Sequence, residues 1–286
     1  MSDLNQIPTD YKKMFDMTLH KYLPKINKMR TLFNSVDADP GQVTFEYVRK
    51  TQTYTDATGW TSFDDPTVIA DGSSAPIDSI GTEDATSTPS SYQKAFRLDR
   101  RILASGVPII RDYVAEHTIE SVNIIENKIN RNLVANMISN AGQSYSATTT
   151  WAAGGDPVGD LTDAKVTFQK QSGGVEADFA VLNNTQYAAL PKDFRFQNTL
   201  YEKEENYLET GTIAPKPLGL DIIVDPAMTS GSFLLGKKGM FADLIVTENY
   251  KVFERDFGAE GKEMQAVFTY VDQYKKPYYL MAGTGI

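Results

Sequence analysis

A long apolar stripe in the middle of the chain restricts the fold more than any other feature. Between Asp112 and Asn140, apolar side chains recur every three or four residues, which is the period of a helix packed on one side. Asp112 is the expected N-cap and Gly142 the expected stop. Such a helix spans about 43 Å at about 1.5 Å per residue. A compact body of 286 residues has a radius of gyration of about 19 Å, so the helix would cross nearly the whole molecule, as in an elongated protein. The stripe consists of Val114, Thr118, Val122, Ile125, Ile129, Leu133 and Met137.

The composition offers few groups for catalysis or metal binding. The 286 residues contain no cysteine and two histidines, His20 and His117, neither of which has a second histidine at metal-ligand spacing. The net charge of −9 argues against a dedicated nucleic-acid reader. No apolar run is long enough to span a bilayer, and the first residues do not form a secretory signal. We therefore expect a non-enzymatic protein with no catalytic residue, no cofactor, no metal and no membrane partner.

Two short motifs resemble ligand-binding loops but lack a required residue. Residues 231–238 (GSFLLGKK) approach a phosphate-binding loop, yet Lys238 stands where the magnesium-binding Ser or Thr belongs. A strand ending in a glycine turn is the better interpretation. The sequence from Asp37 to Gly41 begins like a calcium loop, but its glycine is at the fifth position and not the sixth. We interpret it as a turn before the first strand.

The first 35 residues are basic and contain a helical pattern. Apolar residues from Tyr11 to Phe33 follow a helical period, and Pro24 should kink or break that helix. Such a helix can lie on a membrane or pack on a partner or on its own chain; the modest apolar face and Pro24 favour packing. Six basic residues against three acidic ones give this segment a net charge of +3. The basic residues are Lys12, Lys13, Lys21, Lys25, Lys28 and Arg30.

Two strand-like segments, 43–54 and 92–98, flank a long polar stretch. Residues 55–91 are rich in Ser, Thr, Asp, Gly and Pro and contain no Lys or Arg. Loops longer than about 12–15 residues are uncommon inside compact domains, so we expect a projecting hairpin with an acidic tip. An isolated hairpin is marginally stable in water, and this one should lie on another surface. The tip residues expected to contact that surface are Asp56, Trp60, Asp64, Asp65, Asp71, Asp78, Glu83 and Asp84.

The second half of the chain has a mixed α/β pattern. We expect a helix over 161–171, a buried strand over 177–184, a helix over 185–193 started by Thr185, and a strand over 218–226. Turn residues separate the strand-like runs SFLLG, ADLIVT, YKVFERD, MQAVFTYVDQY and PYYLMAG in the last sixty residues.

The order of these parts resembles the major capsid protein of tailed bacteriophages and related archaeal viruses, which has the HK97-like fold. Three segments carry the resemblance: YQKAFRLDRRILASGVPIIRDY leading into the long helix, ADFAVLNNTQYAALPKD followed by LGLDIIVDPAM, and the closing strands from SFLLGKKGMFADLIVT onward. The resemblance implies an α+β fold with an N-terminal arm, an extended β-hairpin loop, a peripheral domain built on a spine helix, and an axial α/β domain. The implied division is arm 1–40, extended loop 41–101, peripheral domain 102–150 with 244–275, and axial domain 151–243 with 276–286.

The resemblance also implies the function and the partners. It implies self-assembly as hexamers and pentamers into an icosahedral shell, built in the host cytoplasm, that encloses double-stranded DNA in the virion. Residues 1–35 would face the genome or a scaffold, and portal and decoration proteins would be further partners. Some family members crosslink their subunits covalently through an isopeptide bond between a lysine in the extended loop and an asparagine. Here Lys50 and Lys94 lie only at the base of that loop. We therefore expect a non-covalent shell. Some members also carry a cleavable scaffold domain at the N-terminus, whereas this chain has only about 40 residues before its first strand. Either a separate scaffold protein exists or the sequence is already mature, and Met1 favours the former.

Two other interpretations remain open at this stage. An encapsulin-type nanocompartment would share the fold and enclose an enzyme cargo instead of a genome, so the content of purified shells would distinguish it. A soluble α/β enzyme or binding protein would instead be a compact monomer with an activity.

Overall fold

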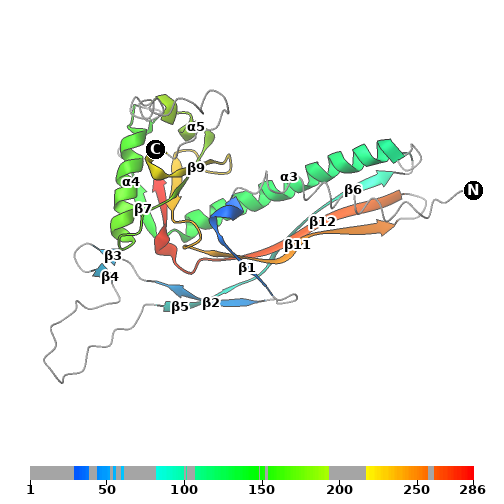
Figure 1. The fold of residues 1–286 in the computed structure, drawn as a ribbon, viewed down its shortest axis with the longest axis horizontal. Coiled ribbons are helices and arrows are strands. Elements are labelled where there is room, and N and C mark those ends of the chain that lie inside the picture. The colour runs from blue at the N-terminus through cyan, green and yellow to red at the C-terminus, as the bar shows by residue number, and fades with distance from the viewer. Residues whose placement is uncertain are drawn as a thin grey trace, which may run out of the picture.

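The computed structural model describes residues 29–38, 44–51, 54–55, 59–60, 82–99, 101, 107–147, 149–151, 154–192, 217–256 and 261–286. These residues form a long arm of helix and sheet, a compact domain at one end of the arm, and a separate hairpin below the junction (Figure 1). The molecule is therefore elongated, as the long apolar stripe predicts.

The long helix α3 (Val107–Asn140) has 34 residues, or about 51 Å at about 1.5 Å per residue. Its predicted stripe is buried along its length, with Val114, Ile129 and Met137 fully inaccessible. The helix begins five residues earlier than predicted, so Asp112 lies inside it and is not the N-cap. Pro108 occupies the first turn, where proline is tolerated because its missing N–H would have no partner in the helix.

The C-terminal end of α3 lies at the predicted residue. The helix ends at Asn140, two residues before Gly142. A Cβ atom on Gly142 would lie 2.7 Å from the carbonyl carbon of Pro277. Glycine is required here because the two backbones approach too closely for a side chain.

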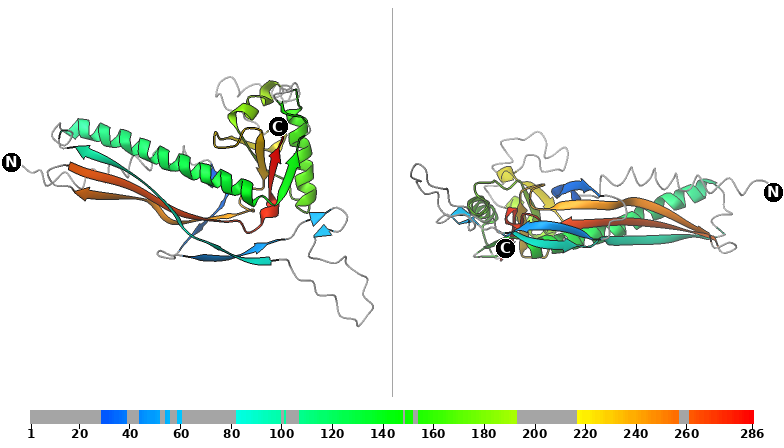
Figure 2. Two further views of the ribbon diagram at one scale, coloured as in Figure 1. Left: turned by 180° about the vertical axis from the view of Figure 1, so that it is seen from behind. Right: turned by 90° about the horizontal axis from the view of Figure 1, so that it is seen from below.

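A four-stranded sheet packs along one side of α3 in the order β1-β11-β12-β6 (Figures 1 and 2). Strands β11, β12 and β6 are antiparallel, and the short β1 runs parallel to the start of β11. The two predicted runs ADLIVT and YKVFERD form one strand, β11, with irregular register at Glu248. The strands are β1 (Asn34–Asp37), β6 (Ser90–Asp99), β11 (Asp243–Asp256) and β12 (Gly261–Gln273).

One of the two strands predicted for the hairpin was wrong. Residues 92–98 belong to β6 and pair with β12, with Phe96 opposite Met264. The hairpin instead joins β2 (Phe45–Lys50) to β5 (Thr82–Ser87). The alternating Tyr92, Phe96 and Leu98 indicate a strand with one face on a core, and Leu98 is fully buried there. The sequence TEDATS of β5 has no such alternation, so the sequence does not indicate that β5 pairs with β2. Two further short strands, β3 (Tyr54–Thr55) and β4 (Gly59–Trp60), pair with each other.

A mixed five-stranded sheet forms the compact domain in the order β7-β13-β10-β8-β9. Its central strands are parts of the predicted buried runs, and Val181 and Leu234 are fully inaccessible. Helix α4 (Pro157–Gln171) packs beside the sheet. The strands are β7 (Gln143–Ser146), β8 (Phe179–Leu182), β9 (Asp221–Val224), β10 (Ser232–Gly236) and β13 (Leu280–Thr284). Short helices complete the domain: α5 (Asn184–Tyr187), η3 (Leu190–Lys192), η4 (Pro217–Gly219) and η6 (Pro277–Tyr279).

Two local predictions in this domain need correction. Strand β7 follows α3 directly and pairs with β13, so residues 143–146 belong to this sheet and not with α3. The helix predicted from Thr185 begins one position earlier, at Asn184, and its N-cap is Asn183. The Asn183 side chain accepts a hydrogen bond from the Thr185 backbone N–H at 3.0 Å, and α5 lasts only four residues before the chain turns into η3.

The N-terminal segment is described only from Met29. Residues 11–28 of the predicted helix, with His20, lie outside the described residues. The last part of the predicted helix is a 3-10 turn, η1 (Met29–Leu32), which leads into β1. Asp37, predicted in a turn, is the last residue of β1. Met29 and Leu32 are buried against α3, which fixes the start of the described chain to the arm.

Candidate assembly surfaces

The β2–β5 hairpin is attached to the rest of the molecule at both ends of β2. Phe45 is 5% exposed and packs with Ile245 and Val271 of the four-stranded sheet. The Lys50 backbone N–H donates a hydrogen bond to the Lys275 carbonyl at 2.9 Å. Between these two attachments, Val48 is 53% exposed. Within the described residues, β2 and β5 form a sheet only with each other, and neither joins the four-stranded sheet.

Most of the predicted contact residues of the hairpin tip cannot be placed. Asp56, Asp64, Asp65, Asp71 and Asp78 lie outside the described residues, and of Trp60 only the backbone in β4 is described.

Glu83 and Asp84 are described and are exposed, but they lie in β5 and not in a tip loop. The Glu83 carboxylate pairs with Arg49 on the facing strand at 3.4 Å. Glu83 is therefore engaged within its own hairpin, and the pair supports the register of β2 on β5.

The predicted basic face is represented in the described residues by Arg30 alone, and Arg30 is not on the surface. Its side chain is 9% exposed, and its guanidinium donates to the carboxylate of Glu126, which is fully buried on the inner face of α3. The guanidinium carbon also lies 4.4 Å from the centre of the Phe268 ring. Arg30 therefore attaches the chain to the arm and is not available to an external polyanion. Lys12, Lys13, Lys21, Lys25 and Lys28 lie outside the described residues.

The buried ion pair is completed by Tyr250 of β11. Its hydroxyl donates to Glu126 at 2.6 Å, so three segments meet at one carboxylate. Burial raises the pKa of Glu126 even though Arg30 and Tyr250 favour the ionised form. Burial, followed by the charge of Glu126, raises the pKa of Tyr250 as well. The sequence pattern gave no sign of this cluster, because an Arg or Glu in a helix usually faces water.

Large apolar side chains are exposed on several elements in the described part of the chain. Single exposed apolar residues are ordinary on protein surfaces, but these are distributed over the hairpin, both long helices and β11. Exposed apolar area of this kind is consistent with contacts to other chains. The residues are Val48, Ile109, Ile124, Val166 and Phe253.

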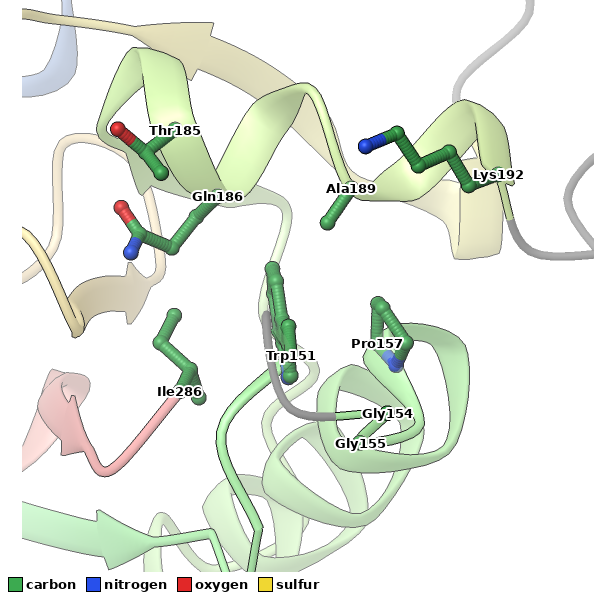
Figure 3. Close-up of a pocket in the computed structure, with 9 residues that line it drawn as sticks. All are labelled: Trp151, Gly154, Gly155, Pro157, Thr185, Gln186, Ala189, Lys192 and Ile286. Atoms are coloured by element: carbon green, nitrogen blue, oxygen red, sulfur yellow. The ribbon is translucent and has the colours of Figure 1, made fainter.

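A pocket of about 430 Å³ lies in the compact domain beside α5 (Figure 3). The Gln186 side chain is 5% exposed, and its Oε1 atom has no hydrogen-bond partner among the described residues. Among the described residues that line it there is neither a carboxylate side chain nor a histidine. The lining residues are Trp151, Gly154, Gly155, Pro157, Thr185, Gln186, Ala189, Lys192 and Ile286.

The remaining candidate motifs are structural where they are described. His117 stacks on Tyr113 and Phe96, with ring centres 4.1 and 5.7 Å away. Residues 232–236 of the loop-like GSFLLGKK motif form β10, and Phe233, Leu234 and Leu235 are buried as predicted. Among the described residues, no group of three His, Asp or Glu side chains could hold a metal ion. None of the described helices is both long enough and apolar enough to cross a membrane.

Comparison with protein families identifies a family that covers most of the fold. A family model described as phage capsid protein matches residues 82–274, which is more than half of the 286 residues. The matched region runs from β5 through β12 and so includes α3 and most strands of both large sheets. No curated protein sequence matches the chain significantly.

Solved structures of similar fold are shells of viruses or virus-like particles. A virus-like particle from Pyrococcus furiosus has a TM-score of 0.63 at 12% identity, covering 96% of this chain and 99% of that one. The capsid of the cyanophage P-SCSP1u has a TM-score of 0.62 at 10% identity, covering 88% and 86%. The mature capsid of bacteriophage PhiM1 has a TM-score of 0.60 at 8% identity, covering 90% and 86%. At these identities the likeness concerns the fold.

Proposed function

Because this chain belongs to the phage capsid protein family, we propose that it is the major head subunit of a virus, assembling as hexamers and pentamers into an icosahedral shell around double-stranded DNA. Its HK97-like fold and its place among structural shell proteins, not enzymes, follow from the family and the fold comparisons. The copy number, the symmetry and the content of the shell belong to the proposal.

One observation supports the proposal most directly: the β2–β5 hairpin joins neither of the two large sheets of its own molecule. Its strands pair only with each other within the described residues, and its apolar contact with the body is concentrated at Phe45. A two-stranded hairpin is marginally stable in water. A neighbouring copy in a ring would cover the hairpin and its exposed Val48. Because the same hairpin then contacts the next copy, the interface is heterologous, which is the type that forms a ring when the rotation between copies closes.

The segments on either side of the hairpin have proposed partners as well. The acidic residues between β4 and β5 would contact complementary charge on the neighbouring subunit, and Glu83 and Asp84 would extend that contact along β5. The basic residues before Met29 would face the packaged DNA or a separate scaffold protein. Portal and decoration proteins would join the shell in the host cytoplasm.

Expression followed by electron microscopy tests the assembly. We expect closed shells built of fivefold and sixfold capsomers, alone or with the scaffold supplied. A protein that stays monomeric with every candidate scaffold would overturn the proposal. Shells from producing cells should hold double-stranded DNA that resists nuclease until they are opened.

The content of the shell separates the two shell functions. The similarity to a virus-like particle keeps a nanocompartment as the second candidate, since that name mentions no genome. Shells that contain a protein cargo and no nuclease-protected DNA would favour the encapsulin-type function.

Charge reversal tests the proposed role of the N-terminal segment. Changing Lys12, Lys13, Lys21 and Lys25 to Glu should impair assembly or DNA packaging. Because Arg30 is buried, it is left unchanged. Normal filled particles from the fourfold variant would refute the role of these lysines.

A further inference from the structure

The face of α3 that points away from the four-stranded sheet is exposed and divided by charge. Its N-terminal part carries the acidic Glu116 and Glu120, and its middle carries the basic Lys128 and Arg131. Ile124 lies between the two groups and is 45% exposed. In full, the exposed residues of the helix from Ile109 onward are Ile109, Asp112, Glu116, Glu120, Ile124, Asn127, Lys128, Arg131, Ala135 and Ser139.

The charges are arranged symmetrically around Ile124. Glu120 precedes it by four residues and Lys128 follows it by four. Glu116 precedes it by eight and Arg131 follows it by seven, a difference that the long arginine side chain can span. Residues at such spacings lie on neighbouring turns of one helix face. A rotation of 180° about an axis through Ile124 therefore exchanges the acidic and the basic positions.

The charges are also available to a partner. Glu116, Lys128 and Arg131 form no ion pair with any residue that the structure describes, and the contact of Glu120 is with the neighbouring His117 at 3.2 Å. The inner side of the same helix is occupied by the core, so these side chains point away from the described part of the subunit.

We propose that α3 packs antiparallel against α3 of a second copy of this chain, about a twofold axis at Ile124. In that arrangement Glu120 faces Lys128 of the partner subunit, and the two Ile124 side chains meet at the centre. Two-fold contacts use one self-complementary patch twice, and helices pack at interaxial distances of about 8–10 Å. A parallel arrangement in register would instead place like charges opposite each other, which is repulsive.

This inference rests on the proposed function for its setting, because a shell needs contacts between rings besides those within a ring. The hairpin supplies a heterologous contact that closes a ring. The charge pattern of α3 supplies an isologous one, which joins two copies without extending a ring. The two contacts therefore use different surfaces and can be tested separately.

The absence of cysteine from the chain makes a crosslinking test direct. In I124C the only two thiols of a dimer would meet at the axis, where a disulfide needs Cβ atoms about 4 Å apart. Oxidation should convert the assembled variant to a covalent dimer on a non-reducing gel. A135C is the matched control, since Ala135 is exposed on the same helix. Its two copies would be about 33 Å apart at about 1.5 Å per residue, so this variant should stay monomeric.

Charge exchange tests the pairing itself. In the I124C background, E120K and K128E alone should each lose the dimer band, because each places like charges opposite each other. The combined E120K/K128E variant should regain it, because the exchange preserves the antiparallel pairing. Rescue would not occur if Lys128 instead faced the acidic hairpin of a neighbouring copy, and that result would overturn the inference.

The remaining outcomes separate this inference from the proposed function. Closed shells in which I124C does not crosslink, or in which A135C crosslinks equally, would refute the helix pairing and leave the capsid function intact. A crosslinked I124C dimer that never forms shells would support the pairing and contradict the capsid function.

Discussion

Replacing Arg30 by Met should destabilise the subunit far more than the loss of a surface ion pair. The change removes the guanidinium beside Glu126 but keeps an unbranched apolar side chain against Phe268. The Glu126 carboxylate is fully inaccessible and would retain only the hydrogen bond from Tyr250 at 2.6 Å. Removing one partner of a buried ion pair costs about 3–5 kcal/mol, since the other charge stays buried. We expect a loss of this size at neutral pH.

The loss should depend on pH, and its sign follows from the pKa of Glu126. Burial raises this pKa above its ordinary value of 4.5, so the folded subunit holds the proton at higher pH than the unfolded chain does. The protonation of Glu126 therefore contributes fully to the free energy of unfolding at low pH, and this contribution is lost as the pH rises through the folded-state pKa. Arg30 lowers this pKa, so its removal raises it further. The stability difference between wild type and R30M should therefore widen as the pH increases above 4.5.

Urea unfolding of the unassembled subunit, followed by tryptophan fluorescence, measures both effects. R49M is the matched control, because Arg49 and Glu83 form an exposed pair with side chains 29% and 51% accessible. Exposed pairs contribute about 0–1 kcal/mol. The double variant R30M/E126Q should recover most of the loss, since the uncompensated charge is gone. A cost for R30M no larger than that of R49M, or one that is the same at pH 5 and pH 8, would refute the reasoning.

Three further outcomes are expected. Particles boiled in denaturant should run as a monomer of 31.7 kDa, because the extended loop lacks lysine between 55 and 91; a ladder of covalent oligomers would contradict a non-covalent shell. F45A should release the hairpin while the rest stays folded, so that hydrogen exchange speeds up at 45–50 and 82–87 and not in α3; uniform protection would show that the anchor lies elsewhere. G142A should lower the free energy of unfolding by about 1–3 kcal/mol through overpacking against Pro277, and an unchanged urea midpoint would show that the backbone can shift.

The sequence predicted those elements whose buried faces are regular. The stripe from Val114 to Met137 predicted α3 with its first residue five positions too late and its last residue correct. Strand alternation located β6 but could not choose its partner. Pairing depends on which apolar faces meet in space, and β5 has no apolar face of its own. The polar strand β5 was therefore included in the long loop predicted over residues 55–91.

The candidate surfaces were less predictable than the fold. Ile124 stands off the main stripe in the sequence, and so does Val134, yet the first is 45% exposed and the second is buried. Helical period gives the angle of a residue around the axis, but not how far the neighbouring elements wrap around it. Arg30 was misplaced for a similar reason. Its charge indicated the surface, and only the tertiary structure brings Glu126 and Tyr250 to meet it.

One turn of α3 carries both the inward ion pair and the proposed outward contact. Glu126 faces the core and Ile124 faces outward, two residues away in the same rigid helix. A buried ion pair adds little stability over apolar residues of the same volume, but its charges are satisfied in only one arrangement. The Arg30–Glu126 pair therefore fixes where η1 meets α3, and with it the position of Met29, the first described residue. If α3 pairs with a second copy at Ile124, the two Met29 residues are fixed relative to each other by the same helices.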